Sequence, residues 1–375
     1  GRYNIGDEIN VTVTFSEAVT LVDGNMVITL ETGTTDRTVT ITSISGSTTA
    51  SGTYTVQAGD VNTDLTVSTI ALSAGALSDA AGNAMSSFSI GTNLSTSSTI
   101  IIDGVLPTIS SVTSSTTDGI YNIGDILAIT VIFSETVIVT GTPQLTLETG
   151  ATDAVVNYAS GSESTTLTFN YTVPAGAVSS DLDYGSTTAL ALNSGTIADS
   201  AGNAATLTLA TPGASNSLGA NKAFVVDGVI PTVSSIASTT ADGTYKQGDA
   251  VAITVTFSEA VTVTGTPQLT LETGTSDAVV NYSSGSGAAT LIFSYTVATG
   301  ETSSDLDYGS TTALALNSGT ITDVAGNAAT LTLVEPGATN SLGADKALVI
   351  DGVVPTVSSV TSTTADGTYN PGDVI

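Results

Sequence analysis

The sequence predicts an all-β chain of tandem β-sandwich domains, and three observations carry that prediction. The motif Asp-Gly-x-x-Pro begins at Asp103, Asp227 and Asp351, at a constant interval of 124 residues. An internal period of this length is typical of whole domains in tandem rather than of a solenoid of short units. Within each period, hydrophobic and polar residues alternate over short segments, which favours strands. No segment shows the periodicity of an amphipathic helix.

The longest alternating segment lies near the start of each repeat. In the third repeat it runs from Val251 to Phe257, with hydrophobic residues at every second position. Period-two alternation with many β-branched residues predicts a strand with one buried face. The alternating hydrophobic residues of the three repeats are Ile9, Val11, Val13 and Phe15; Leu127, Ile129, Val131 and Phe133; and Val251, Ile253, Val255 and Phe257.

Shorter strands are expected around this segment, separated from one another by turn residues. In the third repeat one is expected before it, at residues 232–236, just after the junction proline. Those expected after it span residues 268–272, 278–282, 290–297, 313–317, 328–333 and 347–350. About seven short strands in roughly 100–125 residues indicate an immunoglobulin-like sandwich. A β-propeller is the alternative, but its blades repeat at roughly 40–50 residues, far below the observed period.

The period also predicts the domain boundaries. We expect a first repeat at residues 1–103, a second at 104–227, a third at 228–351, and the opening strand and turn of a fourth at 352–375. The first repeat diverges from the others and lacks its own opening strand. The chain begins and ends in the same phase of the repeat, as expected of a window cut from a longer repetitive protein.

The amino-acid composition of the chain excludes several classes of function. The chain has 34 acidic and 5 basic residues, a formal net charge of −29, and no histidine or cysteine. Such a surface repels nucleic acid and anionic membranes and attracts cations. The lack of cysteine excludes disulfides, thiolate metal sites and a cysteine nucleophile, so metal binding is the expected brace for small extracellular domains. The sequence has no apolar segment of transmembrane length and no signal peptide, so export and anchoring signals are expected outside it.

Acidic residues are expected to meet at the domain junctions. Strands that run alternately down and up a sandwich place Glu259, at the end of the long strand, beside the junction aspartate Asp227. The loop that contains Asp323 and Asn327 is expected at the same end of the sandwich. Carboxylates from three parts of the chain should therefore converge there.

The far end of each sandwich carries a second acidic motif. In Asp181-Leu182-Asp183 both carboxylates point the same way, because side chains i and i+2 share one face of an extended chain. Two negative charges about 4 Å apart repel by roughly 4 kcal/mol at an effective dielectric near 20, and a divalent cation removes that repulsion. Calcium takes about six to eight oxygen ligands, whereas zinc and copper favour histidine or cysteine, and magnesium rarely uses a cage made only of protein.

The predicted calcium ligands occupy the same phase in each repeat. For the junction between the second and third repeats they are Asp181, Asp183, Asp227, Glu259, Asp323 and Asn327. Their equivalents are Asp305, Asp307 and Asp351 at the following junction, and Glu17, Asp79 and Asn83 in the first repeat. The alternative interpretation is that the aspartates only accept backbone hydrogen bonds in turns and the glutamates are solvated strand ends. We favour metal binding because the oxygen ligands converge from separate parts of the chain.

The order of these motifs resembles a known family. Leu-Asp-Tyr at residues 182–184, Asp-x-x-Gly-Asn at 199–203 and Asp-Gly-x-x-Pro at 227–231 are similar to the calcium-binding elements of cadherin repeats, in the same order. Over essentially the whole chain, the repeats resemble the bacterial cadherin-like and immunoglobulin-like modules of giant surface adhesins, including the SwmB type. The resemblance implies calcium held between sandwich domains, which form a linear rod in a long extracellular stalk.

Two departures from the family pattern bear on the ligands. The linker lacks the cadherin run Asp-x-Asn-Asp-Asn, which implies fewer ions at each junction. In the first repeat Thr66 replaces the second aspartate of the Asp-Leu-Asp segment, and Asp60 is the residue expected to compensate. The ligands expected at the first junction are therefore Asp60, Asp64, Asp103, Glu135, Asp199 and Asn203.

The expected function is structural and non-enzymatic: a calcium-rigidified stalk or fibre of a bacterial surface adhesin. The expected partners are neighbouring repeats of the chain and other copies in a filament or surface layer. Self-assembly is the main alternative, in which residues 355–361 complete the first repeat of another copy by donor-strand addition. A glycan-binding module is disfavoured because tryptophan is absent. Paired carboxylates also serve glycoside hydrolases, but one active site copied in every repeat is not expected of an enzyme.

Overall fold

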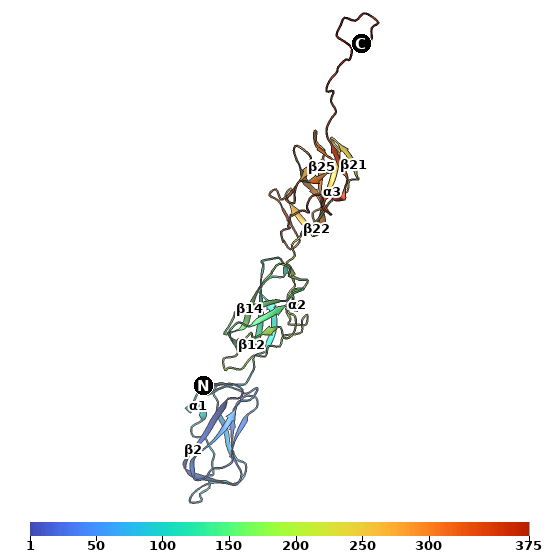
Figure 1. Ribbon diagram of the computed structural model, residues 1–375. Helices are drawn as coiled ribbons and strands as arrows, with labels where there is room; N and C mark the ends of the chain where they lie inside the picture. Colours follow the sequence, from blue (N-terminus) through green and yellow to red (C-terminus); the bar gives the residue numbers. More distant parts are fainter. Residues whose placement is uncertain (375) are drawn as a thin grey trace. The chain divides into compact units, whose positions relative to one another are not determined.

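The computed structural model describes residues 1–374, whose regular secondary structure is almost entirely β (Figure 1). Strands account for 46% of the residues and helices for 3%, which confirms the predicted all-β class. The chain divides into two compact units, Gly1–Val226 and Asp227–Ile375. Buried hydrophobic side chains form three separate cores, two in the first unit (residues 9–102 and 112–226) and one in the second (residues 236–350).

The first core lies between two sheets. Its elements are β1 (Arg2–Tyr3), β2 (Glu8–Val22), β3 (Met26–Leu30), β4 (Arg37–Ile41), β5 (Ser47–Thr55), β6 (Val61–Asn62), β7 (Val67–Leu72), β8 (Ala76–Asp79), α1 (Leu94–Ser97) and β9 (Ile101–Asp103). In one sheet β2 lies between β5 and β8, and in the other β3 lies between β4 and β7. At one end β9 pairs with β1 and β6.

The second core has the same plan with one strand more at its edge. Its elements are β10 (Ile109–Ser114), β11 (Gly119–Tyr121), β12 (Ile126–Thr140), β13 (Gln144–Leu147), β14 (Ala154–Ser160), β15 (Ser164–Thr172), β16 (Val178–Ser179), β17 (Leu190–Ala191), β18 (Thr196–Ala198), α2 (Leu218–Asn221) and β19 (Phe224–Asp227). The strand order is β10-β12-β15-β14-β13-β17, with β18 paired to β12 and a separate sheet β11-β19-β16.

The second unit repeats this arrangement around the third core. Its elements are β20 (Val233–Ser238), β21 (Gly243–Lys246), β22 (Ala250–Thr264), β23 (Gln268–Glu272), β24 (Ala278–Ser284), β25 (Ala288–Thr296), β26 (Thr302–Ser303), β27 (Asp307–Tyr308), β28 (Leu314–Ala315), β29 (Thr320–Thr322), α3 (Leu342–Asp345) and β30 (Leu348–Asp351). Residues 352–374 contain no strand or helix.

The long strand β12 changes its pairing partner part-way along its length. Its first half pairs with β10 along one edge and with β15 along the other. A register shift between Ile132 and Val137 turns the strand, and residues 138–140 pair with β18 instead. In β22 the same shift lies between Thr256 and Val261. Each shift contains a glutamate, Glu135 or Glu259, and so sets the direction of an acidic side chain.

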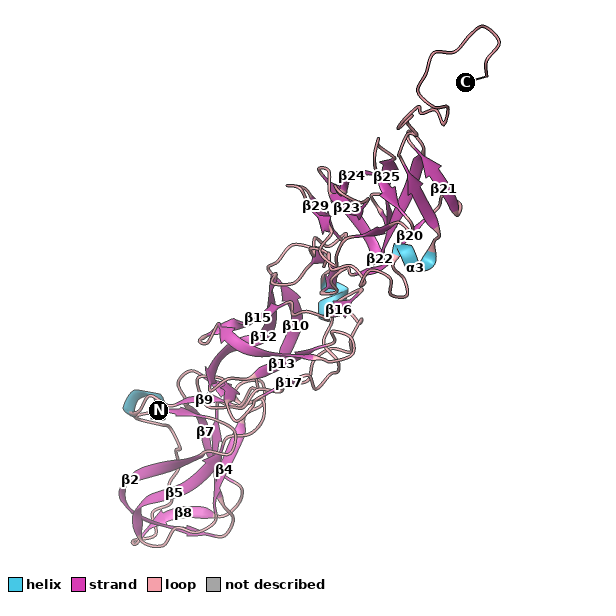
Figure 2. Ribbon diagram, turned by 45° about the horizontal axis from the view of Figure 1, so that its top comes forward, coloured by secondary structure: helices cyan, strands magenta, loops and turns pink. Residues whose placement is uncertain are grey.

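The predicted strands of the third repeat overlap observed ones apart from one segment, and the prediction missed the short strands β21, β26, β27 and β29. Residues 328–333 form only isolated bridges, at Ala328 and Thr330, and not a strand. The short helices, visible in Figure 2, were not predicted, because one helical turn is too short to show periodicity. In α2 the hydroxyl of Ser217 accepts a hydrogen bond from the Ala220 N–H at 3.2 Å, as an N-cap does. No helix among the described residues is long and apolar enough to cross a membrane.

Tyr184 and Tyr308 are packing residues of their cores. Each side chain is 1% exposed. Each hydroxyl donates a hydrogen bond of 2.7 Å to a backbone carbonyl, that of Ala210 for Tyr184 and that of Val334 for Tyr308. The leucine two residues before each tyrosine is fully buried, while the aspartate before that leucine is exposed. The Leu-Asp-Tyr segment therefore anchors one end of the second and of the third sandwich.

The first sandwich lacks one strand that the other two have. β10 and β20 each extend the edge of the long strand in their sandwich. At the equivalent edge of β2 no described strand is paired, since its partners among residues 1–374 are β5 and β8. As a result Val13 and Phe15 are only half-buried, whereas their equivalents Val131 and Phe133 are buried.

Phe169→Ala is expected to lower the free energy of unfolding of the second core by about 3–5 kcal/mol, because the ring is fully buried and its loss leaves a cavity. Hydrogen exchange with mass spectrometry measures this core separately from the others. Val155→Ala, at a side chain that is 57% exposed, is the control and should change stability by less than about 0.5 kcal/mol. An equal loss of protection in all three cores would contradict their separation.

Candidate metal centres

Two groups of carboxylates occupy equivalent positions in the two units. They are the first acidic cluster, Asp103, Glu135 and Asp199, and the second acidic cluster, Asp227, Glu259 and Asp323. In each cluster one oxygen of every carboxylate lies within 4.8 Å of the other two. One aspartate of each cluster is buried and the other two residues are partly buried. Either cluster could hold a metal ion. The structure brings together three of the predicted carboxylates at each junction, and the predicted asparagine, Asn203 or Asn327, is hydrogen-bonded to the loop aspartate.

Three elements position each cluster. Asp103 is the last residue of β9, Glu135 lies in the register shift of β12, and Asp199 directly follows β18. Because β18 pairs with the second half of β12, the end of β18 lies beside that shift. β22 and β29 place the second cluster in the same way, with Asp227 at the start of the unit. The convergence follows from strand pairing and not from proximity in sequence.

The buried aspartate is fixed by its own loop. Oδ1 of Asp199 accepts hydrogen bonds of 2.7–2.9 Å from the backbone N–H groups of residues 201–203. Gly202 has φ = +102°, a conformation that glycine adopts without steric cost. In the second cluster Oδ1 of Asp323 accepts from the N–H groups of Gly326 and Asn327, at 2.7 and 2.9 Å. These bonds hold the carboxylate in a constant orientation.

The asparagine that ends this loop holds the linker. Nδ2 of Asn203 donates to Oδ2 of Asp199 and to the backbone carbonyl of Asp103, both at 2.7 Å. Its Oδ1 accepts from the N–H of Ile5 at 3.1 Å. Asn327 donates in the same way to Asp323 and to the carbonyl of Asp227, both at 2.8 Å. Sequence reasoning predicted these asparagines as metal ligands and missed the linker contact, although their constant phase in the repeat was a usable signal.

Burial and neighbouring charges shift the pKa of the glutamate in each cluster. Burial, followed by the charges of Asp103 and Asp199, raises the pKa of Glu135 above its ordinary value of 4.5. Burial, then Asp227 and Asp323, likewise raises the pKa of Glu259. Oε1 of Glu259 is buried and has no hydrogen-bond partner among residues 1–374. A buried carboxylate oxygen that faces other carboxylates and lacks a donor is suited to a cation.

The carboxylates of the Asp-Leu-Asp segments have partners inside their own repeats. Asp183 accepts hydrogen bonds from the N–H groups of Tyr184 and Gly213, both at 2.9 Å. Asp307 accepts in the same way from Tyr308 and Gly337. The aspartates two residues earlier, Asp181 and Asp305, are exposed. None of the four belongs to an acidic cluster of the described residues, and a ligand role for them stays a prediction.

Asp60 is a buried ion-pair partner. Its Oδ1 lies 2.8 Å from Nε of Arg37, and its Oδ2 accepts hydrogen bonds from the hydroxyl of Tyr54 and the N–H of Gln57, at 2.7 and 3.0 Å. Both oxygens are therefore already engaged. Oδ1 of Asp64 is buried without a partner among the described residues, outside the first acidic cluster. Calcium ligation by either aspartate stays a prediction.

The outermost predicted sites contain fewer carboxylates. In the first repeat Asp79 accepts hydrogen bonds from Asn83, as Asp199 does from Asn203. Glu17 is exposed, and no junction aspartate joins these residues in a cluster within the described part of the chain. Asp351 is also exposed, at the end of β30. Their ligand roles are untested predictions.

Comparison with known proteins reveals only distant structural likeness. No protein-family model and no curated protein sequence matches the chain. Among solved structures, the I-band fragment I67-I69 from titin is similar over 95% of this chain and 95% of its own, with 11% identity and a TM-score of 0.33. The S-layer protein rSbsC(31-844) is similar over 95% of this chain and 55% of its own, with 14% identity and a TM-score of 0.15. Likenesses this weak carry no argument about function.

Asn203→Ala is expected to lower the free energy of unfolding by about 1–3 kcal/mol, because Oδ2 of the buried Asp199 and the linker carbonyl both lose the donor that Asn203 supplies. Asn83→Ala is the matched control, since Asn83 bonds to its loop aspartate alone and is exposed. Denaturant titration of both variants measures the difference. Equal losses would show that the linker contact adds nothing.

Glu135→Gln is expected to raise the melting temperature of the metal-free chain at pH 7. The pKa of Glu135 is raised in the folded state, so the glutamate stabilises the fold most below its unfolded value of 4.5. That contribution is lost as the pH rises through the folded pKa, where the charge meets two other carboxylates. The increase in melting temperature that Glu135→Gln causes should therefore disappear on acidification towards pH 4.5. Calorimetry across this pH range measures it, and Glu17→Gln, at an exposed glutamate, should have no effect.

Proposed function

We propose that this chain is a structural, non-enzymatic repeat region in which calcium ions bound at the acidic clusters brace the repeats. The observation that supports the proposal most directly is the convergence of three carboxylates at equivalent positions 124 residues apart. A turn aspartate that only accepts backbone hydrogen bonds explains Asp199 and Asp323. It does not explain why two further carboxylates approach within 4.8 Å of each of them.

The donor set favours calcium over other metals. Every ligand available in the clusters is an oxygen, and the chain has no histidine or cysteine for zinc or copper. The unpartnered Oε1 of Glu259 is the kind of ligand that a hard cation accepts. The residues proposed to hold the ion are the three carboxylates of each cluster. The ion supplies positive charge that offsets the repulsion among the carboxylates.

The position of the clusters suggests what the ion does mechanically. Asp103 and Asp227 are the last residues of β9 and β19. The other two carboxylates of each cluster belong to the sandwich that follows. An ion bound by all three therefore ties the linker to that sandwich. Proline in the Asp-Gly-x-x-Pro motif adds stiffness, because its ring fixes φ. We propose on this basis that calcium limits bending between repeats.

The proposed setting is extracellular, in a stalk or fibre of a bacterial surface adhesin. Calcium-binding modules outside cells have dissociation constants of roughly 10⁻⁴ to 10⁻³ M, which suits clusters of only three close carboxylates. The strong acidity and the absence of cysteine fit a chain stabilised by cations and not by disulfides. We propose that the chain extends the stalk and keeps it mechanically continuous, and that it does not catalyse a reaction.

Calcium at about 100 times its dissociation constant is expected to stabilise each bound sandwich by about 2.7 kcal/mol. The double variant Glu135→Gln with Glu259→Gln should lose most of this gain, although Glu135→Gln raises the stability of the metal-free chain. This reversal of sign distinguishes a metal site from a cluster of solvated charges. Differential scanning calorimetry with calcium and with excess chelator measures both effects.

The control removes two exposed glutamates at equivalent positions, as Glu148→Gln with Glu272→Gln. It makes the net charge less negative by the same amount and should leave the calcium response unchanged. Small-angle scattering of the same samples reports bending, and chelation should shorten the mean end-to-end length of the wild-type chain. A melting temperature and scattering profile that do not respond to calcium would refute the proposal.

A further inference from the structure

Each sandwich has a buried tyrosine in the strand that leads into one of its turns. We call these turns the exit turns; they are residues 57–60, 174–177 and 298–301. The tyrosines are Tyr54 in β5, Tyr171 in β15 and Tyr295 in β25, and none of them is more than 3% exposed. A hydroxyl group that is buried to this extent needs a hydrogen-bond partner.

In the third sandwich the partner is an acidic residue of the exit turn. Oε2 of Glu301 accepts hydrogen bonds from the Tyr295 hydroxyl at 2.6 Å and from the Ala298 N–H at 2.7 Å. In the first sandwich Asp60 accepts in the same way from the Tyr54 hydroxyl and from the first N–H of the turn, at 2.7 and 3.0 Å. We call this arrangement the acid–tyrosine clasp, and it ties the exit turn to the core.

The residue that supplies the clasp also holds the linker that leaves the sandwich. The backbone carbonyl of Glu301 accepts from the Gly352 N–H at 2.8 Å, and the Gly300 N–H donates to the Gly352 carbonyl at 2.9 Å. Gly104 makes the equivalent two bonds in the first sandwich, at 2.6 and 2.8 Å. A Cβ at Gly352 would lie 2.2 Å from the carbonyl oxygen of Ala298, so this close approach requires glycine. The acid therefore connects the core, the turn and the linker.

The second sandwich lacks the clasp. Ala177 occupies the position of the acid, and Pro174 occupies the position of the N–H donor. The two replacements are consistent with each other, because proline has no N–H for an acid to accept. The hydroxyl oxygen of Tyr171 is buried and has no hydrogen-bond partner among residues 1–374. This sandwich therefore contains a polar group that its exit turn does not satisfy.

The hydroxyl of Thr149 does not take the place of the acid. Burial raises the pKa of Tyr171, and Thr149 lowers it, which is the effect of a donor to the tyrosine oxygen and not of an acceptor. The Thr149 hydroxyl itself donates to the carbonyl of Thr152 at 2.9 Å. The hydroxyl proton of Tyr171 is thus left without an acceptor, and a buried polar group without a partner destabilises the structure that buries it.

We propose that the exit turn of the second sandwich is a built-in point of local opening, which opens more readily than the exit turn of the third sandwich. Opening residues 174–177 lets water satisfy the Tyr171 hydroxyl. Opening residues 298–301 breaks two hydrogen bonds to a carboxylate, which are stronger than bonds between neutral groups. Local openings of this kind differ in free energy from one region of a protein to another.

This property goes beyond the proposed bracing function, because the opening is expected with calcium removed. The sequences of the second and third sandwiches are otherwise closely similar around the turn, as in Phe-Asn-Tyr-Thr-Val at residues 169–173 and Phe-Ser-Tyr-Thr-Val at 293–297. The third sandwich is therefore a matched internal reference for the second. A row of similar domains with one weaker turn has a defined place where it yields first.

Hydrogen exchange at residue resolution, in excess chelator, tests the difference between the turns. The N–H groups of Val173 and Val297 make equivalent hydrogen bonds, to the carbonyls of Asp125 and Asp249 at 2.9 and 3.0 Å. Their relative exchange therefore reports opening and not a difference in bonding. Val173 is expected to exchange at least about 10-fold faster than Val297, after correction for intrinsic rates. Equal protection of the two N–H groups overturns the proposal.

Removing each hydroxyl group tests the cause. Tyr295→Phe breaks the clasp and should lower the protection of Val297 about 10-fold. Tyr171→Phe removes a hydroxyl that has no partner, so it should leave the protection of Val173 unchanged or raise it. A loss of protection in Tyr171→Phe as large as that in Tyr295→Phe would show that the Tyr171 hydroxyl is satisfied, and would refute the proposal.

Pro174→Ala with Ala177→Glu transfers the clasp to the second sandwich. Relative to Pro174→Ala alone, the double variant should raise the protection of Val173 about 10-fold, because the carboxylate gains both the Tyr171 hydroxyl and a turn N–H. Pro174→Ala with Ala175→Glu is the control, since it adds the same charge at an exposed position of the same turn. It should leave the protection of Val173 unchanged. Equal effects of the two glutamates, or no gain from Ala177→Glu in a chain that keeps its circular dichroism spectrum, contradicts the proposal.

Discussion

One asparagine side chain holds each linker to the sandwich that follows it. The amide nitrogens of Asn203 and Asn327 each bridge the loop aspartate and the backbone carbonyl of the junction aspartate, at 2.7–2.8 Å. Both asparagines are at most 5% exposed, so a donor left without a partner there costs about 1–3 kcal/mol. The bridge fixes where the linker leaves the sandwich end. The position of the acidic cluster and the entry of the next opening strand both depend on it.

The same arrangement creates an electrostatic cost. Fixing the linker brings the junction carboxylate within 4.8 Å of two others, and burial adds to the repulsion by removing water. The pKa values of Glu135 and Glu259 are raised because burial and the neighbouring carboxylates both disfavour the charged form. Hydrogen bonds from the loop N–H groups satisfy Asp199 and Asp323 but leave Oε1 of Glu259 without a donor. A bound cation is the simplest way to balance three charges that the backbone geometry forces together.

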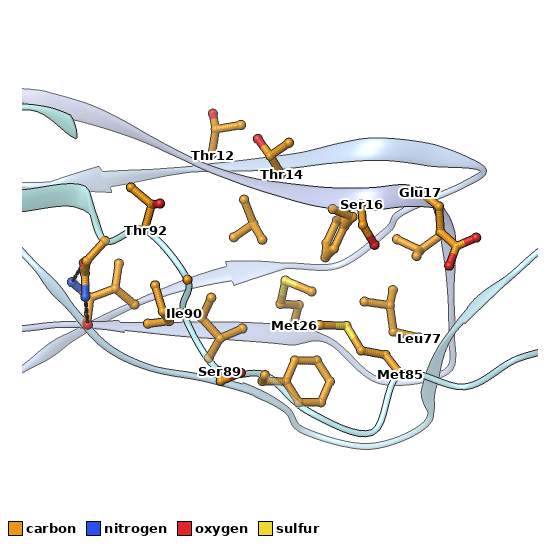
Figure 3. A pocket seen from close by; sticks show the side chains of 18 of the residues that line it. Thr12, Thr14, Ser16, Glu17, Met26, Leu77, Met85, Ser89, Ile90 and Thr92 are labelled. Atoms are coloured by element: carbon orange, nitrogen blue, oxygen red, sulfur yellow. Dashed lines mark hydrogen bonds between the residues drawn. The ribbon is translucent and has the colours of Figure 1, made fainter. Parts of the chain in front are cut away.

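The segment that follows each junction forms the opening strand of the next sandwich, and the burial of that sandwich's core depends on it. β10 and β20 cover the edges of β12 and β22 and bury residues such as Val131 and Val255 completely. In the first sandwich, where the described residues include no such strand, the edge of β2 borders a groove lined by both hydrophobic and polar side chains (Figure 3). A junction therefore positions two things at once, the acidic cluster and the opening strand of the sandwich that follows.

The sequence by itself determined the period, the all-β class and the long strand of each repeat, because these follow from local alternation and from motif spacing. It also placed Asp227, Glu259 and Asp323 together, since alternating strand directions decide which loops share an end. Only the tertiary structure decided which carboxylates have other partners. Asp60 pairs with Arg37 and Tyr54, and Asp183 accepts the N–H of Gly213. These contacts join residues brought close by chain packing, and no local pattern encodes the distance between them. The extent of the β12 register shift, which directs Glu135, is set by strand pairing for the same reason.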